Sequence, residues 1–367
     1  MRIEVMIYIY GAICLSMILF NVVYSLLLRG SKPRLDRRSR KLEGMVQLQL
    51  ERLRRGEHVE EGHQIRMQRK LRHLKNLMAF DQTLRPLVQE EKDSAIHSYL
   101  VELQPTILYL ALVYIRRENM QAAYFSYFLS RYMLKRHMPI QTLQDVMLDY
   151  ARKDNLYCRV NALQALYNFG SPQHICTALQ MQTQSSVFLH EKILTEGLLS
   201  YTGDHSQLIA LLWERLDTFP PHTQLAILNY IRFQTGDYTA QMLELMTNQR
   251  ADKELRLAAI RYFGKYHYQP ALDYLLYFSS QTDPTRWEYA TVSVTALACY
   301  RGERVVIALK QALHSANWYV RYAAAASLEA QQMDYKQLLD IVSGSDRYAR
   351  EMMTYRLESR RMQKAGG

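Results

Sequence analysis

The sequence predicts an all-α protein, an α-solenoid of stacked helix pairs behind one N-terminal transmembrane helix. Three observations predict this fold class. The 367-residue chain begins with a long apolar run that carries no charge. A short motif later recurs, and the apolar positions of its extended register follow one another at steps of 29 to 34 residues, a period typical of stacked supersecondary units. Glycine and proline, which punctuate and break helices, number only 14 and 9.

The apolar run covers residues 5–28, which are 24 residues without a charge. At about 1.5 Å per residue, a helix of this length crosses the roughly 30 Å hydrocarbon core of a bilayer with some tilt. A cleaved signal peptide is the alternative interpretation, but the run is long and no small-residue cleavage site precedes the charges. We therefore expect residues 1–4 to be a short extracytoplasmic N-terminus and residues 5–28 to be a single-pass transmembrane anchor.

A basic segment follows the anchor. Residues 29–75 carry 15 Lys/Arg and 6 Asp/Glu, whereas residues 76–367 carry 30 and 28, so the net charge of +11 is concentrated beside the apolar run. Such a cluster stays on the cytoplasmic side of a membrane and attracts anionic lipids. We therefore expect a membrane protein whose C-terminal domain is cytoplasmic. The basic cluster expected at the membrane surface is Arg29, Lys32, Arg34, Arg37, Arg38, Arg40 and Lys41.

Apolar residues at helical spacing continue beyond the basic cluster and predict a stalk or helical hairpin over residues 29–78. His58 and His63 lie near a turn within it, but their spacing of five places them on different helix faces. We interpret them as part of a solvated turn and not as metal ligands. Two strongly apolar runs, 106–117 and 120–134, are too short to span a bilayer. We expect them to form a packed helix pair.

The strongest signal is a repeat in which an Asn or Asp stands four residues before an Arg. The four pairs are Asn155 and Arg159, Asp252 and Arg256, Asn317 and Arg321, and Asp346 and Arg350. Asn and Asp are favoured N-cap residues, so we expect each pair to begin a helix and each Arg to bond carbonyls or a neighbouring cap across the stack. An apolar residue follows seven positions after each Arg, and the extended register predicts seven buried positions: Leu166, Leu198, Ile231, Phe263, Leu297, Leu328 and Leu357.

Glycines follow several of these positions and are expected to end the first helix of each pair through a positive φ. They are Gly170, Gly203, Gly236 and Gly302. The sequence thus divides into a stalk, a set of N-terminal helical hairpins, a repeat array and a disordered tail, expected at residues 29–78, 79–150, 151–360 and 361–367.

The layout resembles the HEAT-like repeats of the phycobilisome-lyase type, above all in N-W-Y-V-R-Y-A-A-A-A-S-L at residues 317–328. The sequence departs from the pattern at Glu191, Gln224 and Ala290, which occupy the Arg position. The resemblance implies a scaffold that binds other proteins. With its anchor, the chain is similar to bacterial membrane-anchored HEAT-repeat proteins that accompany surface-polysaccharide glycosyltransferases.

No phosphate-loop, dinucleotide-binding or hydrolase motif occurs in the sequence, so we expect no catalytic residue, no metal and no cofactor. The four cysteines are expected to be small buried residues in a reducing compartment. The leading hypothesis is an adaptor that binds a cytosolic protein or the cytosolic face of another membrane protein. A nucleic-acid-binding HEAT-like protein is an alternative, which the near-neutral array disfavours. A lyase or chaperone for a bound chromophore is a second alternative, implied by the family resemblance alone.

Overall fold

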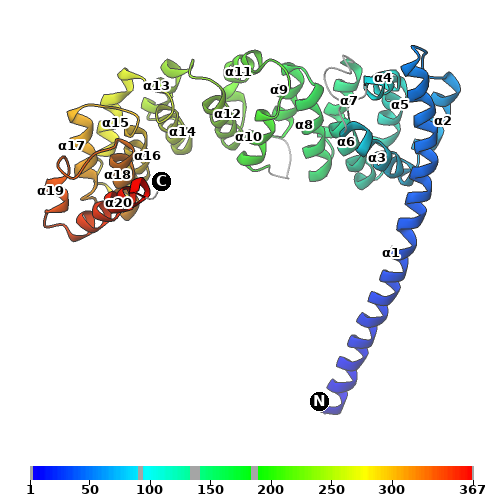
Figure 1. Cartoon of the computed structure of the whole chain (residues 1–367), viewed down its shortest axis with the longest axis horizontal. Helices are drawn as coiled ribbons and strands as arrows, with labels where there is room; N and C mark the ends of the chain where they lie inside the picture. Colours follow the sequence, from blue (N-terminus) through cyan, green and yellow to red (C-terminus); the bar gives the residue numbers. More distant parts are fainter. Residues whose placement is uncertain (1–2, 90–93, 133–140, 183–188, 366–367) are drawn as a thin grey trace. The chain divides into compact units, whose positions relative to one another are not determined.

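The computed structural model describes residues 3–89, 94–132, 141–182 and 189–365, and the side chains of these residues except 3–7, 24–31 and 363–365. Every regular element in these ranges is a helix (Figure 1), so the all-α prediction is confirmed. The chain divides into two compact units, and each is described by itself. Unit 1 consists of residues 1–188 and 200–204, and unit 2 of residues 189–199 and 205–367.

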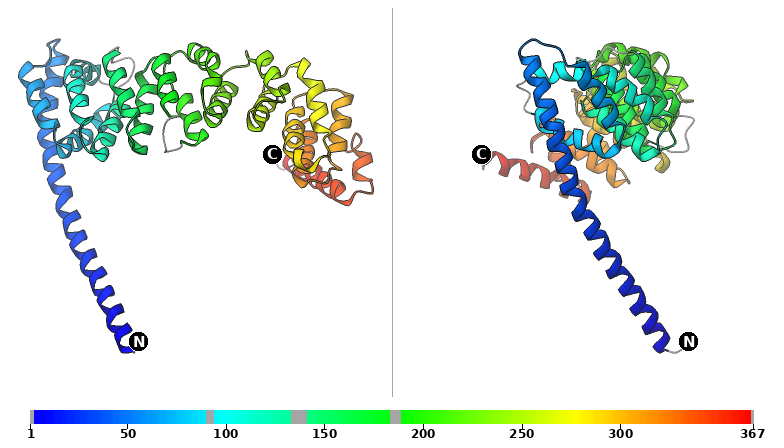
Figure 2. Two further views of the ribbon diagram at one scale, coloured as in Figure 1. Left: turned by 180° about the vertical axis from the view of Figure 1, so that it is seen from behind. Right: turned by 90° about the vertical axis from the view of Figure 1, so that its right-hand side faces the viewer.

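The helices of unit 1 are α1 (Ile3–Arg54), α2 (Glu61–Leu71), α3 (Leu74–Gln89), α4 (Ser94–Glu102), α5 (Gln104–Tyr114), α6 (Asn119–Tyr132), α7 (Gln141–Ala151), α8 (Leu156–Phe169) and α9 (Pro172–Met181). The N-terminal part of α1 projects away from the other helices of unit 1 in both views of Figure 2. Its C-terminal part packs on α3 and α4, and Leu42, Val46 and Leu50 are buried there. This part of the expected stalk therefore contributes to the core of unit 1.

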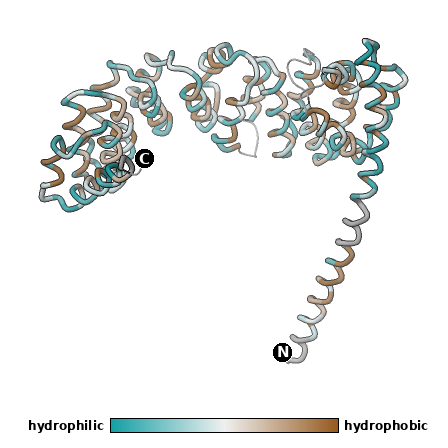
Figure 3. Tube along the Cα trace, in the orientation of Figure 1, coloured by the Kyte–Doolittle hydropathy of each residue, from teal (hydrophilic) through white to brown (hydrophobic). Residues whose placement is uncertain are grey.

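The N-terminal part of α1 is the hydrophobic stretch that Figure 3 shows in brown. The part of this stretch whose side chains the structure describes is the apolar helix Tyr8–Val23. Among the described residues, no single helix is long and apolar enough to cross a membrane. Helices α4 and α5 reach that length and composition only as a pair bent by 55°. Residues 5–7 and 24–28 of the predicted anchor lie outside the described side chains.

The two apolar runs predicted to form a helix pair are α5 and α6, which pack together. The rings of Tyr114 and Phe125 stack between them with centroids 4.8 Å apart. The buried hydroxyl of Tyr114 donates to the carbonyl of Leu71 at 2.7 Å, and that of Tyr150 donates to Ala111 at 2.8 Å. Because a buried hydroxyl without a partner is costly, these bonds fasten neighbouring helix pairs to each other. The predicted packing is confirmed.

The helices of unit 2 are α10 (Glu191–Leu199), α11 (His205–Glu214), α12 (Pro221–Gln234), α13 (Thr239–Thr247), α14 (Lys253–Phe263), α15 (Leu272–Ser279), α16 (Trp287–Leu297), α17 (Glu303–Ala312), α18 (Trp318–Ala330), α19 (Leu339–Val342) and α20 (Arg347–Ala365), with short 3-10 turns η3 (Leu216–Thr218), η4 (Gln269–Ala271) and η5 (Pro284–Arg286). The even-numbered helices pack on one another in chain order, and the odd-numbered helices α11 to α19 each pack on the next even-numbered one. This arrangement is consistent with an α-solenoid.

The predicted repeat register is confirmed. The seven apolar positions lie on successive even-numbered helices from α8 to α20, and all are buried, with Leu357 the most exposed at 8%. Polar side chains of α18 also join this helix to α16, the one before it in the stack. Ser327 donates to the carbonyl of Val294 at 2.9 Å, and Gln331 donates to that of Leu297 at 3.0 Å. The repeat therefore buries one layer of apolar side chains, and polar side chains of α18 donate hydrogen bonds to backbone carbonyls of α16.

The expectation that the four glycines end helices through a positive φ is wrong. Only Gly302 among them has a positive φ, of 123°, and it is the N-cap of α17, whereas α16 already ends at Leu297. A Cβ on Gly170 would lie 2.5 Å from the carbonyl oxygen of Leu166, and one on Gly236 would lie 2.7 Å from the Tyr266 ring. These two positions need glycine for space and not for backbone conformation.

Three other expectations also differ from the structure. His63 is buried, with Nε2 2.9 Å from the Tyr99 hydroxyl, so it does not belong to a solvated turn. Cys14 and Cys299 are exposed, whereas Cys158 and Cys176 are buried as expected. Helix α20 continues to Ala365, into the expected tail, because its last residues (R-M-Q-K-A) are good helix formers.

Candidate functional site

The four recurrent Asn and Asp residues begin helices, as the sequence predicts. Each side-chain oxygen accepts a hydrogen bond from an otherwise unpaired N–H of the first turn. The bonds run from Cys158 to Asn155 at 2.9 Å, from Glu254 to Asp252 at 2.8 Å, from Tyr319 to Asn317 at 2.8 Å, and from Tyr348 to Asp346 at 3.0 Å.

The four recurrent arginines lie one turn into the same helices, and each donates to a backbone carbonyl that precedes its own helix. The bonds run from Arg159 to Lys153 at 2.8 Å, from Arg256 to Met246 at 3.1 Å, from Arg350 to Gly344 at 2.8 Å, and from Arg321 to Ser315. Arg256 also reaches the Tyr289 hydroxyl at 3.4 Å, on the next even-numbered helix. These arginines hold the connecting segments against the helices, which is a structural role.

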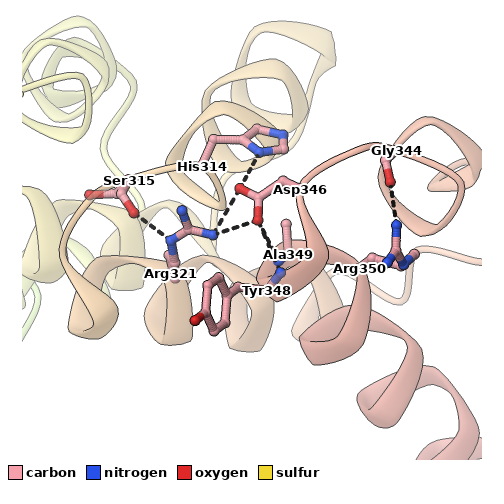
Figure 4. Close-up of polar contacts among 8 residues, drawn as sticks. All are labelled: His314, Ser315, Arg321, Gly344, Asp346, Tyr348, Ala349 and Arg350. Carbon is pink, nitrogen blue, oxygen red and sulfur yellow. Dashed lines mark hydrogen bonds and ion pairs between the residues drawn. The ribbon is translucent and has the colours of Figure 1, made fainter.

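Arg321 makes a further contact that joins two repeats (Figure 4). Its guanidinium donates to both carboxylate oxygens of Asp346, at 3.0 and 2.8 Å. Nδ1 of His314 lies 2.9 Å from the same carboxylate. The hydrogen bonds from His314 and from Arg321 lower the pKa of Asp346 well below its usual range. The carboxylate is therefore ionised at neutral pH, and it serves as a cap and as an ion-pair partner at once.

Four aromatic side chains of α16 and α18 are joined by ring contacts, and a fifth, on α20, lies under the Arg321 guanidinium. We call Trp287, Trp318, Tyr319, Tyr322 and Tyr348 the aromatic surface. The Tyr319 ring lies 5.1 Å from Trp287 and 5.4 Å from Trp318, and Trp318 stacks on Tyr322 at 5.1 Å. Trp318, Tyr319 and Tyr348 are 57%, 56% and 70% exposed. Large exposed aromatic side chains in mutual contact mark an interaction site.

A pocket of about 480 Å³ adjoins the aromatic surface and shares Trp287 with it. The pocket lies where the segment after α15 meets the segment between α17 and α18. Hydroxyl, amide and imidazole side chains line it, with small apolar residues between them. Among its polar residues are Gln281, Asp283, Gln311, His314, Ser315 and Asn317. These groups can both donate and accept hydrogen bonds.

The arginines next to the aromatic surface are paired with carboxylates. Arg321 lies over the Tyr348 ring at 5.8 Å and Arg356 over the Tyr322 ring at 4.7 Å. Arg321 is bound to Asp346, and Arg356 to Glu329. The surface is therefore aromatic and amphipathic, without a concentration of unpaired positive charge.

The basic cluster expected at the membrane surface lies on α1. Lys32, Arg34, Arg37, Arg38, Arg40 and Lys41 are all exposed, and the side chain of Arg29 lies outside the described residues. Arg38 also lines a pocket of about 510 Å³ with Arg72, Lys75 and Arg117. Of the lining residues that the structure describes, four are cations and none is a carboxylate, so the positive surface extends from α1 to the segments after α2 and α5.

Sequence reasoning did not single out the aromatic surface, although Trp318 and Tyr319 lie inside the quoted repeat motif. A usable signal was present, because the spacing of four between Trp318 and Tyr322 and of three between Tyr319 and Tyr322 places the three rings on one side of α18. In the part of the chain with described side chains, no group of three or more His, Cys, Asp or Glu residues could hold a metal ion.

No protein-family model matches the sequence, and no curated protein matches it.

Proposed function

We propose that the protein is a membrane-anchored scaffold whose HEAT-like α-solenoid binds an extended segment of a partner protein at the aromatic surface. The observation that carries this proposal is the set of exposed rings on α18 and α20, which the half-buried Trp287 of α16 joins through its contact with Tyr319. Trp and Tyr dominate the binding energy of protein interfaces, and a hot-spot side chain typically contributes about 2 kcal/mol or more. A partner that covers these rings would remove a large apolar area from water.

The adjoining pocket supports an extended polypeptide as the ligand. An extended segment presents a backbone donor or acceptor at every residue, and the Gln281, Gln311 and Asn317 amides lie in the pocket to meet them. Its apolar side chains would stack on Trp287 and Tyr319, which link the pocket to the exposed rings. Backbone bonds would give affinity, and the rings would select apolar side chains.

A nucleic acid would use the same rings differently. Bases stack on exposed aromatic side chains, but single-strand binding also needs cations along the phosphate backbone. Here the two arginines over the rings are each bound to a carboxylate. The local charge therefore favours a protein segment over a nucleic acid.

The membrane attachment rests on the apolar residues of α1 and the basic cluster that follows them. An apolar helix with a juxtamembrane polybasic segment combines two membrane signals, and the positive charges favour the cytoplasmic side. The scaffold would then hold its partner close to an anionic membrane. The cytosolic part of a membrane enzyme, such as a surface-polysaccharide glycosyltransferase, is a partner of the expected kind.

Co-purification with substituted chains tests the proposal. Tagged full-length protein carrying Trp318→Ala and Tyr319→Ala should lose its partner by roughly tenfold or more, since each truncation removes a hot-spot ring. Tyr274→Ala is the matched control, because Tyr274 is an exposed tyrosine of the same unit on α15, outside the aromatic surface. Equal recovery of the same partner with both variants would contradict the proposal.

A further inference from the structure

A second pocket in unit 2 is lined by positive charges from two repeats. It has a volume of about 460 Å³ and lies between the C-terminal ends of α12 and α14 and the middle of α16. Arg232 comes from α12, Arg261 from α14 and Lys265 from the segment after α14, while Val292 and Thr295 form the α16 side. Among the described residues, no carboxylate lines this pocket.

Two of the three cations already interact with other groups of the protein. The Lys265 ammonium donates to the carbonyls of Arg232 and Phe233 at 3.1 and 3.0 Å, which caps the end of α12. The Arg232 guanidinium lies 4.9 Å from the Phe233 ring. Nε of Arg232 is nevertheless buried without a hydrogen-bond partner in the described structure. A buried N–H left unpaired is costly, and more so on a charged group.

The arginines also disfavour each other's charge. Burial lowers the pKa of Arg232, and the nearby charge of Arg261 lowers it further. Basic residues in the last turn of a helix interact favourably with its dipole, and Arg232 and Arg261 lie in the last turns of α12 and α14. Each arginine is therefore favourably placed on its own helix, but no acid among the described lining residues offsets the convergence of three cations on one pocket. An anion from outside the chain would relieve the repulsion between them.

We propose that Arg232, Arg261 and Lys265 form a binding site for the phosphate group of a phosphoester. Guanidinium groups bind phosphate through two parallel hydrogen bonds, and an ammonium adds a point charge. A phosphate dianion offsets more of the three positive charges than a single carboxylate does. Phe233, Val292 and the remaining volume leave room for the group that carries the phosphate. This site is separate from the aromatic surface and does not depend on the scaffold proposal.

Thermal unfolding of the full-length chain tests the site, with inorganic phosphate and a soluble phosphomonoester as probes and chloride at matched ionic strength as reference. Arg261→Gln should have two opposite effects. Without phosphate it should leave the melting temperature equal or higher, because a like charge beside Arg232 is removed. It should weaken phosphate binding by roughly tenfold, since a charge-assisted bidentate contact is lost. Arg304→Gln, an exposed arginine of unit 2 paired with Asp273 outside the pocket, should bind phosphate like the native chain.

Vesicles separate a soluble phosphoester from a lipid headgroup. Native and Arg261→Gln chains are compared on vesicles that contain phosphatidic acid and on vesicles of equal charge that contain phosphatidylserine. Soluble phosphate that stabilises the native chain but not Arg261→Gln supports the site with a soluble ligand. Arg261-dependent binding only to phosphatidic acid supports the same site with a lipid headgroup. Identical behaviour of native and Arg261→Gln chains towards every probe would overturn the proposal.

Discussion

Arg321 on α18 binds both carboxylate oxygens of Asp346, the residue that begins α20, at 3.0 and 2.8 Å. One carboxylate thereby caps a helix and ties the preceding repeat to it. The same contact places Arg321 over Tyr348 and so fixes one edge of the aromatic surface. The residues that maintain the repeat also position the exposed rings.

Substitutions at Asp346 should separate its two roles. Asp346→Ala removes the cap and the ion pair, and we expect it to lower the free energy of unfolding by about 1 to 2 kcal/mol. Asp346→Ser keeps a capping oxygen and loses the ion pair with Arg321 and the contact with His314, so it should cost less than about 1 kcal/mol. Urea denaturation of full-length protein measures both. Equal losses for the two variants would show that the cap contributes nothing.

Ala324 tests the repeat register, because its side chain is fully buried in the middle of α18. Ala324→Asp places an unpaired charge in that layer and should destabilise unit 2 by roughly 3 kcal/mol or more. Ala330→Asp is the matched control, since Ala330 is exposed at the end of the same helix. Similar melting temperatures for the two variants would be incompatible with the described packing.

His63 should make unit 1 sensitive to mild acid. Its burial, with a smaller effect from Arg66, lowers its pKa to about 4. Between pH 6.5 and 4 the unfolded chain therefore binds a proton that the folded chain does not, so stability falls as the pH falls. The expected loss between pH 7 and pH 5 is about 2 kcal/mol. His63→Gln should flatten this dependence in urea titrations, whereas His190→Gln, at an exposed position, should not.

The orientation predicted from the basic cluster is tested by reporters fused after Gly367. Arg34, Arg37 and their neighbours favour the cytoplasmic side, so a cytosolic reporter should be active there. A reporter that works only after export should stay silent. Activity of the exported reporter would contradict the orientation.

The sequence predicted the repeat because its determinants are local. Asn317 caps a helix through the N–H two residues on, and Leu328 is buried because the helical period places it on the stacked face. The same reasoning failed at Gly170 and Gly236, where the constraint is space next to Leu166 and Tyr266. Tyr266, which crowds Gly236, is 30 residues away in the sequence. The residues next to the glycine in the sequence therefore do not reveal this contact.

The candidate sites could be predicted only in part. The basic cluster is continuous in the sequence and was found from charge alone. The aromatic surface draws Trp287, Tyr322 and Tyr348 from α16, α18 and α20, and the pocket proposed to bind phosphate draws Arg232, Arg261 and Val292 from α12, α14 and α16. Only the stacking of successive repeats brings such residues together. A period of 29 to 34 residues shows that repeats stack, but not which side chains remain exposed.

Site-specific photo-crosslinking tests most directly whether the aromatic surface binds a segment of a partner protein. A photoreactive phenylalanine analogue at position 319 is compared in cells with the same residue at position 274, which is an exposed tyrosine outside the aromatic surface. The proposed binding surface predicts that position 319 forms a crosslink to a discrete protein segment, that position 274 does not, and that Trp318→Ala diminishes the crosslink. A crosslink from position 319 to nucleic acid, or the same crosslinked protein from both positions, would contradict it.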